Sequence, residues 1–153
     1  MNVAQLNPFL TAIQDVFTQF GVTDIEKVSV QLKDDMIIDQ DVTAFVGIVG
    51  EMQGNVSYCF SNETAKKIAS MMMMGMPVDE MHEMARSALA ELANIITGSA
   101  ASIFANDEIL LEITPPSLVA GEEMYFILTF LKTFTVILNS SLGTIEVNVA
   151  LEL

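Results

Sequence analysis

The sequence ARSALAELANII, residues 85–96, predicts a helix with one apolar and one polar face. Ser87, Glu91 and Asn94 are spaced i, i+4 and i+7. At roughly 100° per residue, these three polar side chains fall within an arc of about 60°. The opposite side carries Leu89, Leu92, Ile96 and Ile103, with the small residues Ala85 and Ala100 between them. We therefore expect a helix that buries one side and presents a carboxylate and a carboxamide on the other.

The polar face continues with residues that have almost no side chain. Gly98, Ala101 and Ala105 follow the motif on the exposed side of the predicted helix. Glycine inside a helix is less favourable than alanine by about 1 kcal/mol, so a close contact with another surface would explain Gly98. This geometry suits a site that admits another molecule, with Ser87, Glu91 and Gly98 as predicted partner-binding residues. From the spacing alone, the solvated back of an amphipathic helix is the more common explanation of such a polar stripe.

The remaining sequence predicts alternating helices and strands within a single domain, residues 1–153. Predicted helices cover residues 7–20, 61–74 and 79–105, the last beginning at Asp79. Predicted strands cover residues 27–32, 43–51, 56–60, 109–113 and 145–153. Residues 124–138 are interpreted as one or two strands with a break near Lys132. Pro115, Pro116 and Gly121 indicate an irregular connection.

Two segments of the chain have the same pattern. A turn glycine followed by an alternating strand occurs at residues 54–60 and again at residues 143–149. Each segment lies downstream of an amphipathic helix and earlier strands. This pattern predicts two related halves, although unrelated sheets can produce it as well.

The motif Ser-x3-Glu-x2-Asn at Ser87, Glu91 and Asn94 resembles the signature of the CheC/CheX/FliY phosphatases, which dephosphorylate the chemotaxis response regulator CheY. That signature ends with a proline some twenty residues later, near the position of Pro115 and Pro116 here. The order of the predicted elements matches the family over most of the chain. The resemblance implies an α+β fold with a largely antiparallel sheet, two long amphipathic helices on one face and a pseudo-twofold axis.

The resemblance also implies how many sites the chain has. Doubled members of the family carry Glu-x2-Asn on both helices, whereas the first helix here offers Gln14-Asp15-Val16-Phe17. We therefore expect a single site, as in the CheX type.

The implied activity is hydrolysis of the aspartyl-phosphate of CheY, with Glu91 and Asn94 as catalytic residues. Such an acyl phosphate needs a positioned water and stabilised equatorial charge more than a protein nucleophile. Asn94 can orient the water because a carboxamide both donates and accepts hydrogen bonds. Glu91 would pair with a lysine of the partner, and Ser87 would make a contact rather than act as a nucleophile. No cofactor is expected on this chain, and Mg²⁺ would belong to the phosphorylated partner.

The resemblance further implies a homodimer joined through sheet edges, with the terminal strand or another exposed edge providing the contact. Two alternatives remain open. The first is a non-catalytic interaction module that binds a response regulator or a flagellar switch component. The second is a small-ligand sensor that uses the methionines at residues 71–74 and Met76, although packing into the core or a dimer interface is the simpler interpretation of these residues.

Composition excludes several classes of function. Twenty acidic residues against six basic ones give a formal charge of −14, which argues against nucleic-acid and anionic-membrane binding. The single cysteine, Cys59, excludes an internal disulfide and is expected to be a buried thiol. Neither His82 nor the acidic residues at positions 34–41 form a metal-ligand pattern. No signal peptide is visible, so we expect a cytoplasmic protein.

Overall fold

The computed structural model describes residues 2–153 as three α-helices, one short 3-10 helix and nine strands. The helices are η1 (Val3–Leu6), α1 (Asn7–Gln19), α2 (Asn62–Met72) and α3 (Glu83–Asn106). The strands are β1 (Glu26–Lys33), β2 (Met36–Ile38), β3 (Val42–Gly50), β4 (Gln53–Phe60), β5 (Leu111–Ile113), β6 (Ser117–Ala120), β7 (Phe126–Thr129), β8 (Thr133–Ser140) and β9 (Gly143–Glu152).

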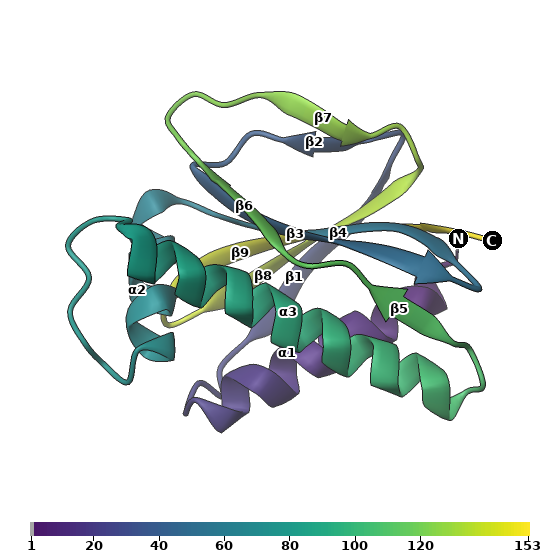
Figure 1. Cartoon of the computed structure of the whole chain (residues 1–153), viewed down its shortest axis with the longest axis horizontal. Coiled ribbons are helices and arrows are strands. Elements are labelled where there is room, and N and C mark those ends of the chain that lie inside the picture. The colour runs from purple at the N-terminus through teal and green to yellow at the C-terminus, as the bar shows by residue number, and fades with distance from the viewer. Residues whose placement is uncertain (1) are drawn as a thin grey trace.

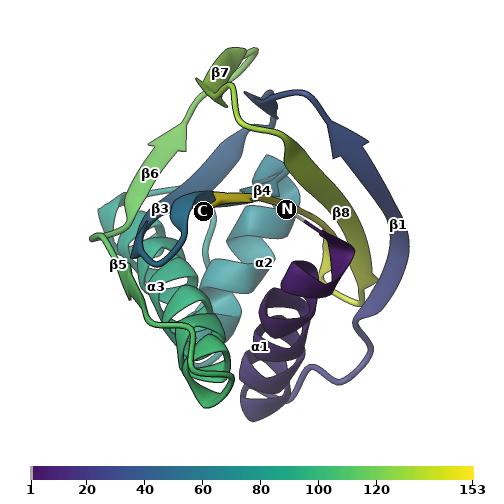
Figure 2. The ribbon, with the colours of Figure 1, turned by 90° about the vertical axis from the view of Figure 1, so that its right-hand side faces the viewer.

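Seven of the strands form one antiparallel sheet. Its order is β1-β8-β9-β4-β3-β5, and β6 pairs with β3 on the same side as β5. All three α-helices lie on one face of this sheet (Figures 1 and 2). The predicted fold class, α+β with a largely antiparallel sheet and long helices on one face, is confirmed.

The strand order of the sheet is symmetric. Replacing each strand by its counterpart in the other half of the chain gives the same order, read from the opposite edge. The hairpins β3–β4 and β8–β9 meet at the centre through β4 and β9, which pair with each other. Each edge strand pairs with the hairpin of the other half, β1 with β8 and β5 and β6 with β3. The two related segments predicted at residues 54–60 and 143–149 are thus neighbouring central strands, and Figure 2 shows α1 and α3 to either side of this central pair.

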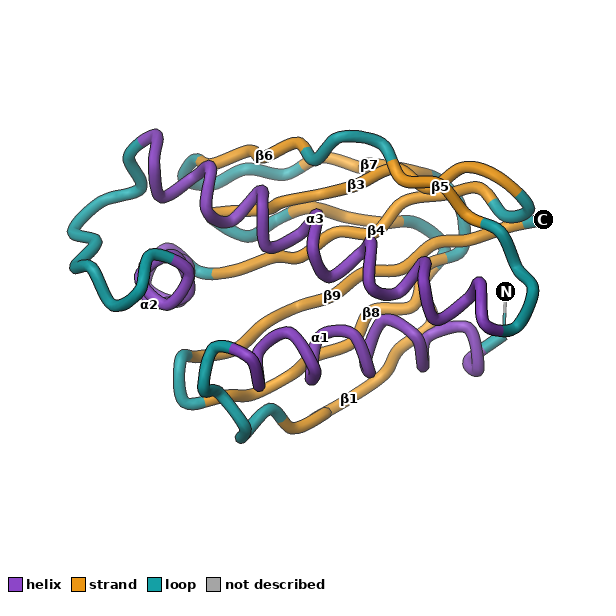
Figure 3. Tube along the Cα trace, turned by 60° about the horizontal axis from the view of Figure 1, so that its bottom comes forward, coloured by secondary structure: helices purple, strands orange, loops and turns teal. Residues whose placement is uncertain are grey.

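The main core lies between the sheet and the helices. Helices α1 and α3 lie side by side and run in opposite directions (Figure 3). Phe9 of α1 and Phe104 of α3 meet edge to face with ring centroids 5.8 Å apart. Such aromatic pairs contribute roughly 0.5–1.5 kcal/mol beyond the burial of their area.

The opposite face of the sheet is covered by the ribbon of β2 and β7. Met36 and Ile38 of this ribbon are fully buried and form a second small core with Cys59. Cys59 is therefore a buried thiol, as predicted.

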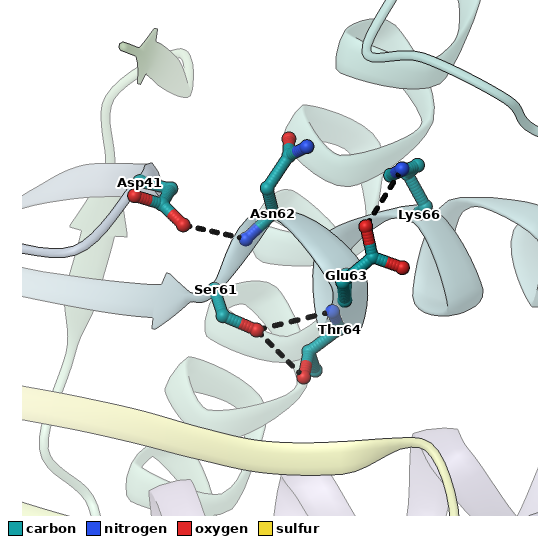
Figure 4. Close-up of polar contacts among 6 residues, drawn as sticks. All are labelled: Asp41, Ser61, Asn62, Glu63, Thr64 and Lys66. Atoms are coloured by element: carbon teal, nitrogen blue, oxygen red, sulfur yellow. Dashed lines mark hydrogen bonds and ion pairs between the residues drawn. The ribbon is translucent and has the colours of Figure 1, made fainter. Parts of the chain in front are cut away.

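Helix α2 begins where the sequence predicts. The Ser61 hydroxyl accepts a hydrogen bond from the Thr64 backbone N–H at 3.2 Å, and the Asp41 carboxylate accepts one from the Asn62 N–H at 2.9 Å (Figure 4). Lys66 pairs with Glu63 at 2.8 Å on the same turn. The contacts made by Ser61 and Asp41 satisfy backbone donors that a helix N-terminus leaves unpaired.

Three expectations differ from the structure. The terminal strand β9 lies between β8 and β4, so it is not a sheet edge and cannot join two chains edge to edge. The long helix begins at Glu83 rather than Asp79, because His82 caps it by accepting a hydrogen bond from the Ala85 N–H at 3.2 Å. The short strands β2 and β6 were not predicted, because three or four residues carry too little periodicity.

Helix α3 is long and apolar enough to cross a membrane by length and composition alone. Its most apolar 18-residue window has a mean hydropathy of 1.4, and 39% of that window is buried within the protein. Its buried residues pack against α1, α2 and the sheet. This packing is typical of a core helix, which can be as long and as apolar as a membrane-spanning one.

Candidate functional site

A buried hydrogen-bonded pair joins helix α3 to the sheet. The Thr97 hydroxyl donates to the Ala93 carbonyl at 2.7 Å and lies 2.8 Å from the Tyr58 hydroxyl of strand β4. Burial raises the pKa of the Tyr58 phenol, so this group stays neutral and remains a donor at physiological pH. Because a buried polar pair is costly to break, it reinforces the orientation that the buried apolar face of α3, with Leu89, Leu92 and Ile96, already sets.

The predicted motif therefore points away from the core. Ser87 and Glu91 are exposed and Asn94 is half-buried, whereas Leu89 and Leu92 are fully buried. Within residues 2–153, no hydrogen bond or ion pair occupies the side chains of Ser87, Glu91 or Asn94. The structure thus brings the three predicted residues to one surface, with the carboxylate and the carboxamide free to contact another molecule.

Gly98 lies on the same outward surface of α3 as Glu91 and Asn94. The packing of the protein does not require a glycine at this position. A Cβ atom built on Gly98 would meet only the Ile113 Cδ1 atom, at 3.8 Å, which is an ordinary van der Waals contact. An alanine would therefore fit within the chain. The missing side chain leaves the surface open to a molecule that approaches from outside.

The predicted proline segment lies beside α3. Pro115 and Pro116 separate β5 from β6, two strands that both pair with β3 and contact α3. Thr114 holds this segment to β3, because its N–H donates to the Gly47 carbonyl and its hydroxyl accepts from the Gly47 N–H, each at 2.9 Å. The proline interruption therefore borders the helix that carries the motif (Figure 1).

Two residues of this region were missed by the motif. Met84 lies on the same stripe, two turns before Glu91 and about 20° from it at 100° per residue, and its side chain is 61% exposed. Continuing the helical stripe three residues before Ser87 would have found Met84. Thr97 carries no sequence signal, because its importance depends on Tyr58 in a distant strand.

The other candidate residues do not form sites. Within residues 2–153, no group of three or more His, Cys, Asp or Glu side chains is placed to hold a metal ion. His82 caps α3, and Asp34 makes an exposed ion pair with Lys132 at 3.1 Å. Met71 packs against the core, whereas Met74 is 96% exposed, so packing explains only part of the methionine cluster.

Comparison with known proteins identifies the family. The model of the family described as "Chemotaxis phosphatase CheX" matches residues 42–131, which include the whole of α3 and the proline segment. This chain belongs to the CheX family.

A curated relative agrees with this assignment, and two solved structures share the fold. The CheY-P phosphatase CheX of Thermotoga maritima is 37% identical over 101 residues, a match that covers 66% of this chain and 62% of that protein. A CheC-like protein from Shewanella has the same fold, with a TM-score of 0.88 at 23% identity over 99% of each chain. The CheX–CheY–BeF3–Mg²⁺ complex from Borrelia burgdorferi matches with a TM-score of 0.82 at 26% identity, covering 99% of this chain and 100% of that one.

Proposed function

We propose that this protein is a phosphatase that hydrolyses the aspartyl-phosphate of a CheY-type response regulator and so ends its signal. The observation that carries the proposal is the outward stripe of α3, where Glu91 and Asn94 have no partner within residues 2–153 and Gly98 leaves the surface bare. Family membership supports it, since a curated relative is a CheY-P phosphatase. A single buried cysteine is compatible with the reducing cytoplasm, where we place the protein.

In this proposal, Asn94 positions the attacking water. Its carboxamide is half-buried and hydrogen-bonds to no group of the described chain, so an oxygen acceptor and two N–H donors are available. A water held by the carboxamide in line with the leaving carboxylate oxygen reacts without the entropy loss of finding that geometry. The amide does not act as a base; its role is to orient the attacking water.

Glu91 sets the register of the two proteins. It is exposed one turn before Asn94, and its carboxylate can pair with a cationic side chain near the phosphoryl group of the partner. A charge pair that becomes desolvated on docking is specific because leaving one member unpaired is costly. Ser87, one further turn away, contributes a contact at the edge of the same surface.

Charge on the phosphoryl oxygens is neutralised from the partner's side. A CheX relative has been crystallised with CheY, BeF3 and Mg²⁺, and we propose that Mg²⁺ belongs to the receiver domain here as well. This chain then needs to supply only the water-orienting amide and the docking carboxylate.

We also propose a homodimer formed through the β2–β7 ribbon. Both strands of a two-stranded ribbon have an open edge, and large exposed side chains flank β7, with Tyr125 just before it at 68% and Phe130 just after it at 80% exposure. Sedimentation velocity at micromolar concentration should find a dimer for the wild type and a monomer for Phe130→Ser. Leu32→Ser, at the exposed edge strand β1, is the matched control and should remain dimeric.

The test of the phosphatase is the decay of phosphorylated CheY from the same source, measured together with binding. Wild type should accelerate the decay, and Asn94→Ala should lose about a hundredfold of that acceleration while still binding. Binding with unchanged decay would instead identify a non-catalytic interaction module. Neither binding nor faster decay with any receiver domain would refute the proposal.

A further inference from the structure

Within the residues that the structure describes, Met84 is the only large apolar side chain of helices α1, α2 and α3 that is exposed. It is 61% exposed in the first turn of α3, whereas its neighbour Ala85 is fully buried. Every other large apolar residue of the three helices is at least partly buried. A single exposed apolar residue is common on protein surfaces, so it is the position of Met84 that gives it a role.

That position is the N-terminal end of the outward stripe formed by Ser87, Glu91 and Asn94. At 100° per residue, Met84 points within about 20° of the direction of Glu91. The first turn is held in place by the hydrogen bond of 3.2 Å from the Ala85 N–H to His82 Nδ1. The helix rotation that exposes the motif therefore directs Met84 outward as well.

The distance along the helix places Met84 inside an interface of ordinary size centred on the motif. Met84 precedes Asn94 by ten residues, which is about 15 Å at a rise of 1.5 Å per residue. A typical interface buries about 800 Å² on each partner, and a disc of that area is roughly 30 Å across. A domain seated over the midpoint of Glu91 and Asn94 therefore reaches Met84 at one end of the stripe and Ala101 at the other.

The two ends of this surface differ in chemistry. The C-terminal end is bare, because Gly98 and Ala101 carry no more than a methyl group. The N-terminal end carries an unbranched thioether, which adapts its shape to a partner and is only a weak hydrogen-bond acceptor. Methionine is enriched in protein interfaces, where charged residues are depleted from the centre. The N-terminal end of the stripe is thus suited to an apolar contact.

We propose that Met84 is the apolar anchor of the docking surface and determines which receiver domains dock. It fits an apolar patch of the receiver domain about 15 Å from the phosphoryl group that Asn94 faces, the separation of the two residues along the helix. This inference rests on the proposed function of Glu91 and Asn94.

The anchor adds a selectivity that the other two residues lack. Glu91 and Asn94 face the chemistry of the phosphoryl group, whereas Met84 contacts a surface away from it. Met84 can therefore distinguish receiver domains that share the same phosphoryl chemistry. A receiver domain with a charged group at the contact would leave that charge desolvated against the thioether and would dock poorly.

Two substitutions of Met84 separate the apolar contact from helix stability. Glutamine and leucine have helix propensities close to that of methionine, and the position is exposed, so Met84→Gln and Met84→Leu should both fold. Only leucine keeps an apolar surface. Met74→Gln is the matched control, because Met74 is 96% exposed in the turn that ends α2, where its N–H donates to the Met71 carbonyl at 3.3 Å.

The experiment measures the decay of phosphorylated CheY and, separately, the binding of CheY that carries BeF3 in place of the phosphoryl group. Met84→Gln should raise KM and Kd about tenfold with kcat unchanged, because the contact is made equally in the ground state and the transition state. Met84→Leu should recover most of this loss, and Met74→Gln should match the wild type. Thermal unfolding verifies that each variant is folded.

The possible results are distinguishable. Wild type that neither binds CheY nor accelerates its dephosphorylation refutes the proposed function and with it this inference. Active wild type, combined with unchanged KM and Kd in folded Met84→Gln, overturns the anchor alone. An equal loss in Met84→Leu or in Met74→Gln would also overturn it, because the effect would then not depend on an apolar side chain at this position.

Discussion

The hydroxyl groups of Tyr58 and Thr97 lie 2.8 Å apart in the buried interface between strand β4 and helix α3. Thr97 follows Asn94 by three residues, and its hydroxyl also donates to the Ala93 carbonyl. The pair therefore joins the centre of the sheet to the helix turn that carries the carboxamide. It is the contact that links the stability of the fold to the orientation of the proposed site.

Thr97→Val should destabilise the protein by about 1–3 kcal/mol, because it leaves the buried Tyr58 hydroxyl without its acceptor. Tyr58→Phe should cost less, since Thr97 keeps its bond to Ala93. The double variant should be more stable than the sum of the single effects predicts. Urea unfolding of the four proteins measures this cycle, and additive effects would mean that the two hydroxyls do not interact.

Gly98→Ala should raise stability and lower activity. Alanine is better than glycine inside a helix by about 0.8–1.0 kcal/mol, and the added methyl group meets only Ile113 at van der Waals distance. The same methyl group would hinder a partner docked on Glu91 and Asn94, so binding to phosphorylated CheY should weaken.

Thr18→Ala in α1 provides the matched control for this stability gain, since Thr18 is exposed on another helix and lies outside the proposed site. It should stabilise the protein slightly and leave CheY-P decay unchanged. Unchanged binding by Gly98→Ala would show that the bare surface at Gly98 is not part of the docking face.

Cys59 should not react with thiol reagents in the folded protein. Burial raises the pKa of the Cys59 thiol from about 9 to about 12, so almost no thiolate is present near neutral pH and the sulfur is inaccessible. Ellman's reagent at pH 8 should modify the protein only after denaturation. Rapid modification of the native protein would contradict the buried second core beneath the β2–β7 ribbon.

The same shift predicts alkaline destabilisation. Since the folded pKa is raised, this contribution to stability is fully present below pH 9 and is lost as the pH rises toward 12. Each pH unit in that window should remove up to about 1.4 kcal/mol from the free energy of unfolding. Urea unfolding between pH 8 and 11 measures the slope, and Cys59→Ala should reduce it.

The sequence alone predicted the elements that have strong periodicity or clear caps. Ser61 marked the start of α2, and the alternation of apolar residues marked the central strands and the buried face of α3. The outward stripe of Ser87, Glu91 and Asn94 followed from helical spacing, because a helix that buries one side must expose the other.

Other features depend on contacts between distant segments. The capping role of His82 and the bond between Thr97 and Tyr58 are set by tertiary geometry. The terminal strand looked like a half-exposed edge because its polar and apolar residues alternate, yet the ribbon covers its polar side and buries Asn148.

The most direct test of the central claim is multiple-turnover phosphate release from an excess of phosphorylated CheY. The proposed roles predict that Asn94→Ala lowers kcat by about a hundredfold with little change in KM, because the amide orients water in the transition state. Glu91→Ala should raise KM strongly, because it removes a docking contact. A wild-type protein that releases no phosphate beyond the intrinsic decay of CheY-P, or an Asn94→Ala variant with full kcat, would contradict the account.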